Sequence, residues 1–323
     1  MKLVSAIILA MVLMSPAVFG AHAMTIGSGV GSLSFTVADD HGFINGSDCT
    51  FDATGSSPGT TVWNWCWAIY DVAGDNIYYV DDFTGTHAAP NEPTGGTPSA
   101  TATSLDTTGI AFPNTAALTA DLNMTLTAPT PGDTARVTSS WTLSNSGGTA
   151  LDVRVFFFLD LDLDLDGGSY ATDMVALVPS TINGGIALAC GNITGLGPAG
   201  FYTLDLNAGI LTECVSHVPT AVAALQNSAG ASYYWSDYAP YYDTTGIDGN
   251  REIVPPLRNA VENDTIVADY LSDDGSDSGY VMQVDVSVPA AGSETVTIQS
   301  TWGENQVLSA GSLPAELSVL TSD

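Results

Sequence analysis

The sequence predicts an all-β fold, a large antiparallel β-sandwich with long loops and at most two short helices. Short segments alternate apolar with polar residues or are rich in β-branched and aromatic residues, and clusters of Gly, Asn, Asp, Ser and Thr separate them. Apolar residues at helical spacing are scarce. The chain has 323 residues and a hydrophobic content of 45%, which is enough to bury one sizeable core.

The segments that match the strand pattern follow one another along the whole chain. They are residues 33–38, 62–71, 76–81, 118–126, 135–143, 151–165, 174–178, 186–189, 201–206, 280–288 and 295–302. The segments 135–143 and 151–165 are separated by a Ser-Asn-Ser-Gly-Gly-Thr turn and predict a hairpin. Residues 219–226 and 257–270 are expected to form the two short helices.

Residues 1–23 have the three-part form of a secretory signal peptide. Lys2 precedes an apolar run, and small residues end at Ala23, after which cleavage is expected. The run is shorter than the ~20 residues that a membrane-spanning helix requires. We therefore expect a secreted protein, periplasmic, on the cell surface or extracellular, with no membrane insertion after cleavage. Residues 24–323 are expected to form one sandwich domain, with a Pro-, Gly- and Thr-rich loop or linker at 84–104.

The charge balance restricts the partners of the protein. The formal net charge is −30 and the only lysine is Lys2. Binding of nucleic acid or of anionic lipid requires basic residues, so both are excluded as partners. The expected partners are a neutral polysaccharide or a second copy of the chain. An acidic surface is equally typical of a protein that stays soluble in saline water.

Aspartates occupy alternate positions before a Gly-Gly pair. They are Asp160, Asp162, Asp164 and Asp166. In an extended strand these carboxylates share one face, about 6.5 to 7 Å apart. Counted from Asp162, the spacing D-x-D-x-D-G-x5-D ends at Asp173 and matches a calcium loop with Asp in place of the terminal Glu. The sequence therefore predicts a Ca²⁺ site formed by Asp162, Asp164, Asp166 and Asp173.

The alternative interpretation of this segment is an amphipathic strand. The odd positions of residues 151–165 are all apolar, whereas the four aspartates occupy even positions. On that interpretation the aspartates are the solvated side of a half-buried strand. Like charges stacked on one face destabilise a strand unless salt or a metal screens them, which favours the calcium interpretation.

Four cysteines remain after cleavage, and an even number in an exported chain predicts two disulfides. Three connectivities are open, and our prediction is that neighbours pair, Cys49 with Cys66 and Cys190 with Cys214. No C-x-x-C zinc motif is present.

Two groups of aromatic residues have two interpretations each. Trp63, Trp65 and Trp67 alternate along one predicted strand and either pack in the core or bind ligand. A tyrosine-rich segment likewise either packs in the core or supplies the candidate glycan-binding residues, in which aromatic rings stack on sugars and an acid binds hydroxyls. These candidates are Tyr233, Trp235, Asp237 and Tyr238.

The sequence contains no G-x-S-x-G, H-E-x-x-H or phosphate-binding glycine motif. We therefore expect a secreted, calcium-stabilised, non-catalytic β-sandwich protein of the cell surface or extracellular matrix that binds glycan or associates with itself. The alternative is an extracellular glycoside hydrolase or polysaccharide lyase, which needs only two suitably spaced carboxylates. The carboxylates considered for that role are Asp237, Asp243, Asp248 and Glu252.

Residues 137–169 carry a resemblance to a known group of proteins. The run VTSSW followed by TLSNSGGTALDVRVFFFLDLDLDLDGGS resembles uncharacterised exported bacterial β-sandwich proteins that often end in a PEP-CTERM sorting tail. The resemblance implies export and a β-sandwich fold, and it assigns no activity and no functional residue. No Pro-Glu-Pro signal occurs in this sequence.

Overall fold

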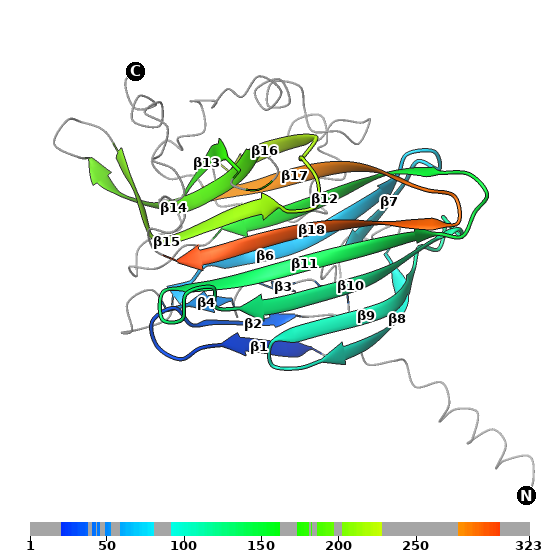
Figure 1. The fold of residues 1–323 in the computed structure, drawn as a ribbon. Helices are drawn as coiled ribbons and strands as arrows, with labels where there is room; N and C mark the ends of the chain where they lie inside the picture. Colours follow the sequence, from blue (N-terminus) through cyan, green and yellow to red (C-terminus); the bar gives the residue numbers. More distant parts are fainter. Residues whose placement is uncertain are drawn as a thin grey trace, which may run out of the picture.

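The structure is a computed structural model that describes residues 21–37, 41–42, 44–45, 49–52, 59–80, 92–161, 173–180, 182, 186–196, 202–227 and 277–303. Within these ranges the chain contains no helix, and its strands form two antiparallel sheets that pack face to face (Figure 1). The predicted all-β sandwich is confirmed. None of the described residues belongs to a helix long and apolar enough to cross a membrane.

Sheet A contains ten strands in the order β16-β17-β12-β6-β3-β2-β4-β5, with β1 beside β2 and β7 beside β6. The bounds are β1 His22–Ile26, β2 Leu33–Val37, β3 Ile44–Asn45, β4 Thr50–Phe51, β5 Gly59–Thr60, β6 Val62–Asp71, β7 Asn76–Val80, β12 Leu151–Leu161, β16 Ala221–Asn227 and β17 Asp277–Val288. The long strands β6, β12 and β17 lie next to one another in this sheet.

Sheet B contains eight strands in the order β13-β14-β15-β18-β11-β10-β9-β8. The bounds are β8 Thr94–Ala100, β9 Ser104–Ala111, β10 Leu118–Thr127, β11 Thr134–Asn145, β13 Asp173–Pro179, β14 Ile186–Leu196, β15 Tyr202–Cys214 and β18 Gly292–Gly303. Strand β10 shows the alternation expected of a strand with one buried face: its apolar residues are buried and alternate with polar residues that are mostly exposed.

Large aromatic side chains fill the space between the sheets. Trp65 and Trp67 of β6 meet Trp302 of β18 and Trp141 of β11, with ring centroids 6.0 and 6.2 Å apart. The ring centroid of Phe157 of β12 lies 4.8 and 4.9 Å from those of the two β6 tryptophans. The core interpretation of the tryptophan stripe is therefore confirmed for Trp65 and Trp67, and the side chain of Trp63 lies outside the described part of the structure.

Strand β12 is buried on both of its faces along the Phe-Phe-Phe segment. Phe157 points into the core, while Phe156 and Phe158 share the opposite face of sheet A and are also fully buried. Ala68 of β6, which pairs with Phe156, is buried on that opposite face as well. This double burial explains why the sequence is continuously apolar here instead of alternating.

Two predicted elements are wrong in type. Residues 219–226, predicted as a short helix, lie largely in strand β16, which pairs with β17. Pairing along an available sheet edge outweighs a weak local preference for helix. The expected loop at 84–104 contains β8 and the first residue of β9. Strand β8 lies at the edge of sheet B and is largely exposed, so it lacks the apolar alternation that identifies a strand. The predicted helix at 257–270 lies outside the described residues.

The predicted disulfide between Cys49 and Cys66 is not formed, since Cys49 is a buried free thiol. Its Sγ lies 3.6 Å from the hydroxyl of Thr61, and that hydroxyl accepts a hydrogen bond from the indole of Trp302 in sheet B. Cys49 therefore faces the space between the sheets. Cys66 stands between the two inward-pointing tryptophans of β6, so the pleat of the strand directs it to the other face of sheet A.

The predicted disulfide between Cys190 and Cys214 is not formed either, because Cys214 is also a buried free thiol. The register of β14 and β15 places Cys190 opposite Ile210. Cys214 follows four residues later in β15, roughly 13 Å along the strand. A disulfide requires Cα atoms within about 7 Å, so the two residues cannot be joined in this register.

Candidate functional site

Most of the residues that the sequence nominates as sites lie outside the described part of the structure. This applies to Asp162, Asp164 and Asp166, to the candidate glycan-binding residues Tyr233, Trp235, Asp237 and Tyr238, and to the candidate carboxylates Asp243, Asp248 and Glu252. Asp173 begins β13, where its backbone pairs with Asn192 of β14. The described residues contain no group of three or more His, Cys, Asp or Glu side chains placed to hold a metal ion.

The outer face of sheet B carries polar side chains along two paired strands. Strand β11 buries alternate residues in the core and leaves the intervening ones half-buried on the outside. Strand β18 pairs with β11 along its full length, so its outward residues form a matching row. We call these outward residues the hydroxyl face. They are Arg136, Thr138, Ser140, Thr142 and Ser144 of β11, and Ser293, Thr295, Thr297, Gln299 and Thr301 of β18.

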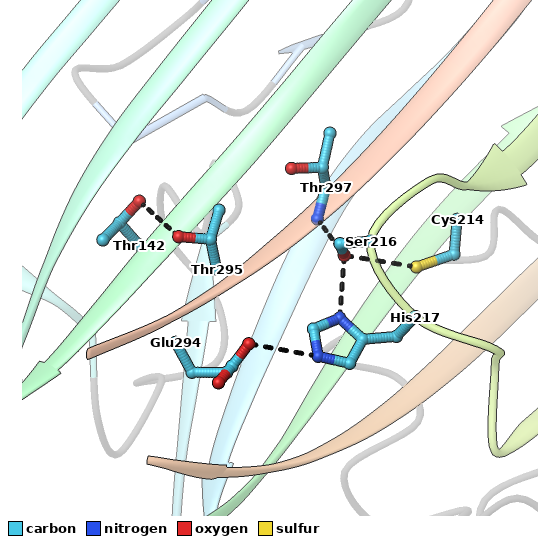
Figure 2. A network of polar contacts seen from close by, with 7 residues as sticks. All are labelled: Thr142, Cys214, Ser216, His217, Glu294, Thr295 and Thr297. Atoms are coloured by element: carbon cyan, nitrogen blue, oxygen red, sulfur yellow. Dashed lines mark hydrogen bonds and ion pairs between the residues drawn. The ribbon is translucent and has the colours of Figure 1, made fainter. Parts of the chain in front are cut away.

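Hydrogen bonds between side chains hold the hydroxyl face in order. The Ser140 and Thr297 hydroxyls lie 2.8 Å apart. The Thr142 and Thr295 hydroxyls lie 3.0 Å apart, as Figure 2 shows. Each pair contributes about 0.2–1 kcal/mol to pairing of the two strands. Successive cross-strand pairs of the hydroxyl face lie about 7 Å apart along the strands, and the two strands themselves lie about 4.8 Å apart.

A buried carboxylate lies next to the hydroxyl face on β15. Glu213 is 3% exposed and pairs in register with Gln299, whose amide donates a hydrogen bond of 3.4 Å to Oε2. The hydroxyl of Ser180 lies 3.0 Å from Oε1. These hydrogen bonds offset part of the large free energy required to take a carboxylate out of water. Glu213 has no motif around it, and the sequence did not single it out.

Just after β15 ends at Cys214, the side chain of Ser216 replaces the backbone in the pairing with β18. The backbone amide of Val215 donates to the carbonyl of Thr297 at 2.9 Å, as in a regular ladder. The next residue, Ser216, accepts a hydrogen bond of 2.9 Å from the amide of Thr297 through its side-chain hydroxyl, which takes the place of a backbone carbonyl. Ser216 is therefore fixed against β18 while the residue itself stays exposed.

From Ser216 the contacts continue through His217 to Glu294 (Figure 2). His217 Nδ1 lies 2.8 Å from the Ser216 hydroxyl, and His217 Nε2 lies 3.3 Å from Glu294 Oε1. The amide of Thr297 already occupies a lone pair of the serine oxygen, so the hydroxyl proton can be donated to Nδ1. Nε2 then carries the ring proton and faces the carboxylate.

The three side chains form a serine–histidine–carboxylate relay, which is the arrangement that activates a hydroxyl as a nucleophile. The side chains of His217 and Glu294 are 26% and 37% exposed, so the relay opens to solvent. Behind it, the buried Sγ of Cys214 lies 3.7 Å from the Ser216 hydroxyl. The sequence did not identify this group, because Glu294 is far from His217 along the chain and no motif surrounds either residue.

Comparison with known proteins finds no matching family model and no matching curated protein. Among solved structures, the Slr1438 protein of Synechocystis sp. PCC 6803 matches with 10% identity and a TM-score of 0.39, over 90% of this chain and 98% of that chain. An amine oxidase of Aspergillus nidulans matches with 10% identity and a TM-score of 0.34, over 89% and 51%. The "Putative aldose 1-epimerase" of Escherichia coli K12 matches with 10% identity and a TM-score of 0.31, over 88% and 99%. TM-scores this low assign the chain neither an activity nor a ligand.

Proposed function

We propose that the protein is a secreted, calcium-stabilised β-sandwich of the cell surface or extracellular matrix that binds a neutral polysaccharide on the hydroxyl face. The observation that supports this proposal is the pair of matching rows on β11 and β18, in which hydroxyl groups are already hydrogen-bonded across the strands. A neutral polysaccharide carries hydroxyls at repeating intervals, and each of them both donates and accepts. Such a ligand can replace the water on this face without leaving polar groups unpaired.

The charge of the protein favours a neutral ligand over the alternatives. With a formal net charge of −30, the protein repels acidic polysaccharides and also repels other copies of itself. On the hydroxyl face, Arg136 donates a hydrogen bond of 2.9 Å to the hydroxyl of Thr301, which links the one basic residue of this face to its neighbour. A neutral chain meets no electrostatic repulsion there.

The hydroxyl face is expected to bind weakly at any one sugar and more tightly to a long chain. A single exchanged hydrogen bond contributes about 0.5–1.5 kcal/mol. Gln299 and Thr301 of β18 are buried, but the cross-strand pairs from Ser144–Ser293 to Ser140–Thr297 reach solvent, so successive sugars of one polymer can engage successive pairs. Binding should therefore increase with the length of the oligosaccharide.

The decisive test is retention of the purified protein on insoluble neutral polysaccharides such as cellulose, chitin and starch. The double variant Thr142→Val and Thr295→Val removes one hydroxyl pair and keeps the side-chain shape. We expect about tenfold weaker retention, the effect of roughly two lost hydrogen bonds. The matched control is Thr25→Val with Ser34→Ala, which removes a hydroxyl pair of sheet A with the same 3.0 Å spacing.

The proposal fails if the protein is retained on none of these polysaccharides, or if the control variant loses as much binding as the test variant. Light scattering distinguishes glycan binding from self-association of the protein. If the chain forms dimers that the Thr142→Val and Thr295→Val changes dissociate, the hydroxyl face binds a second copy of the protein instead of a glycan.

A further inference from the structure

We propose that Ser216 is a nucleophile that cleaves esters of small acyl groups, with His217 as its general base and Glu294 as a positioning residue. This activity goes beyond binding of a polysaccharide. It depends on the geometry of the relay, and only the identity of the molecule that carries the ester rests on the proposed function.

The two distances in the relay suit a proton transfer from Ser216 to His217 and an ion pair between His217 and Glu294. The 2.8 Å between the Ser216 hydroxyl and His217 Nδ1 is within hydrogen-bond reach of a general base for its nucleophile. The 3.3 Å between His217 Nε2 and Glu294 Oε1 orients the ring and stabilises the imidazolium that forms when the base takes up the proton.

Backbone hydrogen bonds fix the serine in place. The amide of Thr297 donates to the Ser216 oxygen at 2.9 Å, which holds this atom in place and leaves its hydroxyl proton free to point to His217 Nδ1. The amide of Val215, one residue earlier, bonds to the carbonyl of Thr297 at 2.9 Å and holds the segment in register with β18. A serine that only ended the strand would need the first of these bonds, but it would need neither the imidazole nor the carboxylate.

The openness of the site indicates the class of substrate. Ser216 is exposed, and Val218, two residues further along the chain, is 58% exposed, so the nucleophile is accessible and an apolar side chain follows it closely in the sequence. A large molecule that carries the ester can approach from solvent. Thr297 contributes its amide to the relay and its hydroxyl to the hydroxyl face, which places the nucleophile next to the proposed polysaccharide. The ester that fits both features is an O-acyl group on a neutral polysaccharide.

The reaction proceeds in two balanced steps. The Ser216 oxygen attacks the ester carbonyl as its proton passes to His217 Nδ1, and the bond to the alcohol breaks while the alcohol takes that proton. Water then attacks the acyl-serine and gives a proton to Nδ1. The bond to Ser216 breaks, the serine oxygen recovers the proton, and the acyl group leaves as a carboxylic acid.

The first experiment treats the purified full chain with a fluorophosphonate probe and locates the label by peptide mass spectrometry. Hydrolysis of p-nitrophenyl acetate is measured in parallel. We expect the label on Ser216, and we expect Ser216→Ala to abolish it and to lower kcat/KM at least about 100-fold. The control Ser34→Ala removes a hydroxyl of sheet A and should change neither result. The proposal is overturned if the folded wild-type chain is not labelled at Ser216.

Two further variants separate catalysis from support of the fold. His217→Gln keeps a neutral hydrogen-bonding side chain but cannot take up a proton, so a folded His217→Gln protein with wild-type turnover also overturns the proposal. Glu294→Gln should lower kcat about tenfold and leave KM unchanged, because Glu294 acts only through His217. If this variant changes stability but not kcat, Glu294 has no role in the reaction.

The two proposals can fail separately. If Ser216 is labelled but the protein is not retained on polysaccharide, the ester cleavage stands and its assignment to a polysaccharide falls. If retention is normal but Ser216 is not labelled, the hydroxyl face binds glycan without chemistry at its edge.

Discussion

Trp65 of sheet A stacks on Trp302 of sheet B, with ring centroids 6.0 Å apart and ring planes inclined by 9°. The indole N–H of Trp302 also donates a hydrogen bond of 3.1 Å to the hydroxyl of Thr61, beside the start of β6. The same side chain therefore joins the two sheets by apolar contact and by a directed bond. Both rings are fully buried, so this contact is a central part of the core.

Two replacements of Trp302 should separate the stability contributed by its ring from that contributed by its hydrogen bond to Thr61. Trp302→Ala removes the whole ring and should lower the free energy of unfolding by about 3–5 kcal/mol. Trp302→Phe keeps an aromatic ring but leaves the Thr61 hydroxyl without its donor, and should lower it by about 1–3 kcal/mol. Urea titration measures both. The control Val72→Ala, at a side chain 36% exposed, should change stability by less than about 0.5 kcal/mol. Equal losses in the two Trp302 variants would show that the hydrogen bond to Thr61 dominates.

Two glycines in the β1–β2 turn provide a matched pair. Gly31 has φ +77° and a Cβ there would lie 2.6 Å from the backbone nitrogen of Asp133, in the turn between β10 and β11. Gly29 has φ +75° and nothing within 4 Å. Gly29→Ala should therefore show only the conformational penalty of about 1–2 kcal/mol. Gly31→Ala adds a backbone clash between the sheets and should lower the melting temperature clearly further. If both variants melt at the same temperature, the turn moves freely away from Asp133.

The sequence predicted the strands whose alternation reflects one buried and one solvated face. The expected strand 118–126 is observed as β10, Leu118–Thr127, and the expected strand 135–143 lies within β11, Thr134–Asn145. Prediction failed where this physical signal is absent. Strand β8 buries little on either side, and β16 is rich in alanine, which favours a helix when the neighbouring β17 is not considered.

Functional groups that depend on tertiary contacts were harder to predict than the strands. The pairing of β15 with β18 brings Ser216 to Thr297, and the position of His217 next to Glu294 follows from it. No local pattern encodes that register. The disulfide prediction failed for a related reason: closeness in sequence determines neither the face of a pleated strand that carries a thiol, as for Cys49 and Cys66, nor the register of two strands, as for Cys190 and Cys214.

The thiol of Cys49 should be unreactive while the protein is folded. Burial raises the pKa of Cys49 from 9.0 to about 12, an effect that the hydrogen bond from Thr61 opposes only in part. The thiolate is the form that reacts, so alkylation of Cys49 at pH 8 should require unfolding. Iodoacetamide labelling with and without urea, read by mass spectrometry at the Cys49 peptide, measures this. Rapid labelling without urea would mean that this part of the core opens readily.

The same pKa shift predicts how stability changes at high pH. Above pH 9 the unfolded chain releases the Cys49 proton while the folded chain keeps it, so the folded state binds more protons and stability falls as pH rises. The contribution is fully present below pH 9 and is lost between pH 9 and about 12, by up to roughly 1.4 kcal/mol per pH unit. In Cys49→Ala this contribution is absent, so its stability deficit relative to wild type should shrink across that window. A constant deficit would contradict the predicted shift.

Calcium should stabilise the protein through the predicted site at Asp162, Asp164, Asp166 and Asp173. A ligand that binds only the folded state raises the free energy of unfolding by about 2.7 kcal/mol at a concentration 100 times its Kd. Wild type should therefore melt at a higher temperature in calcium than in chelator, and Asp164→Ala should lose most of this difference. Asp152→Ala is the matched control, because Asp152 is an exposed acid of β12, the strand that leads into the aspartate run. Removal of either acid lowers the negative charge equally, so only the metal interpretation predicts different responses to calcium. Equal melting temperatures of the wild-type protein in calcium and chelator would leave the aspartates as the solvated side of the strand.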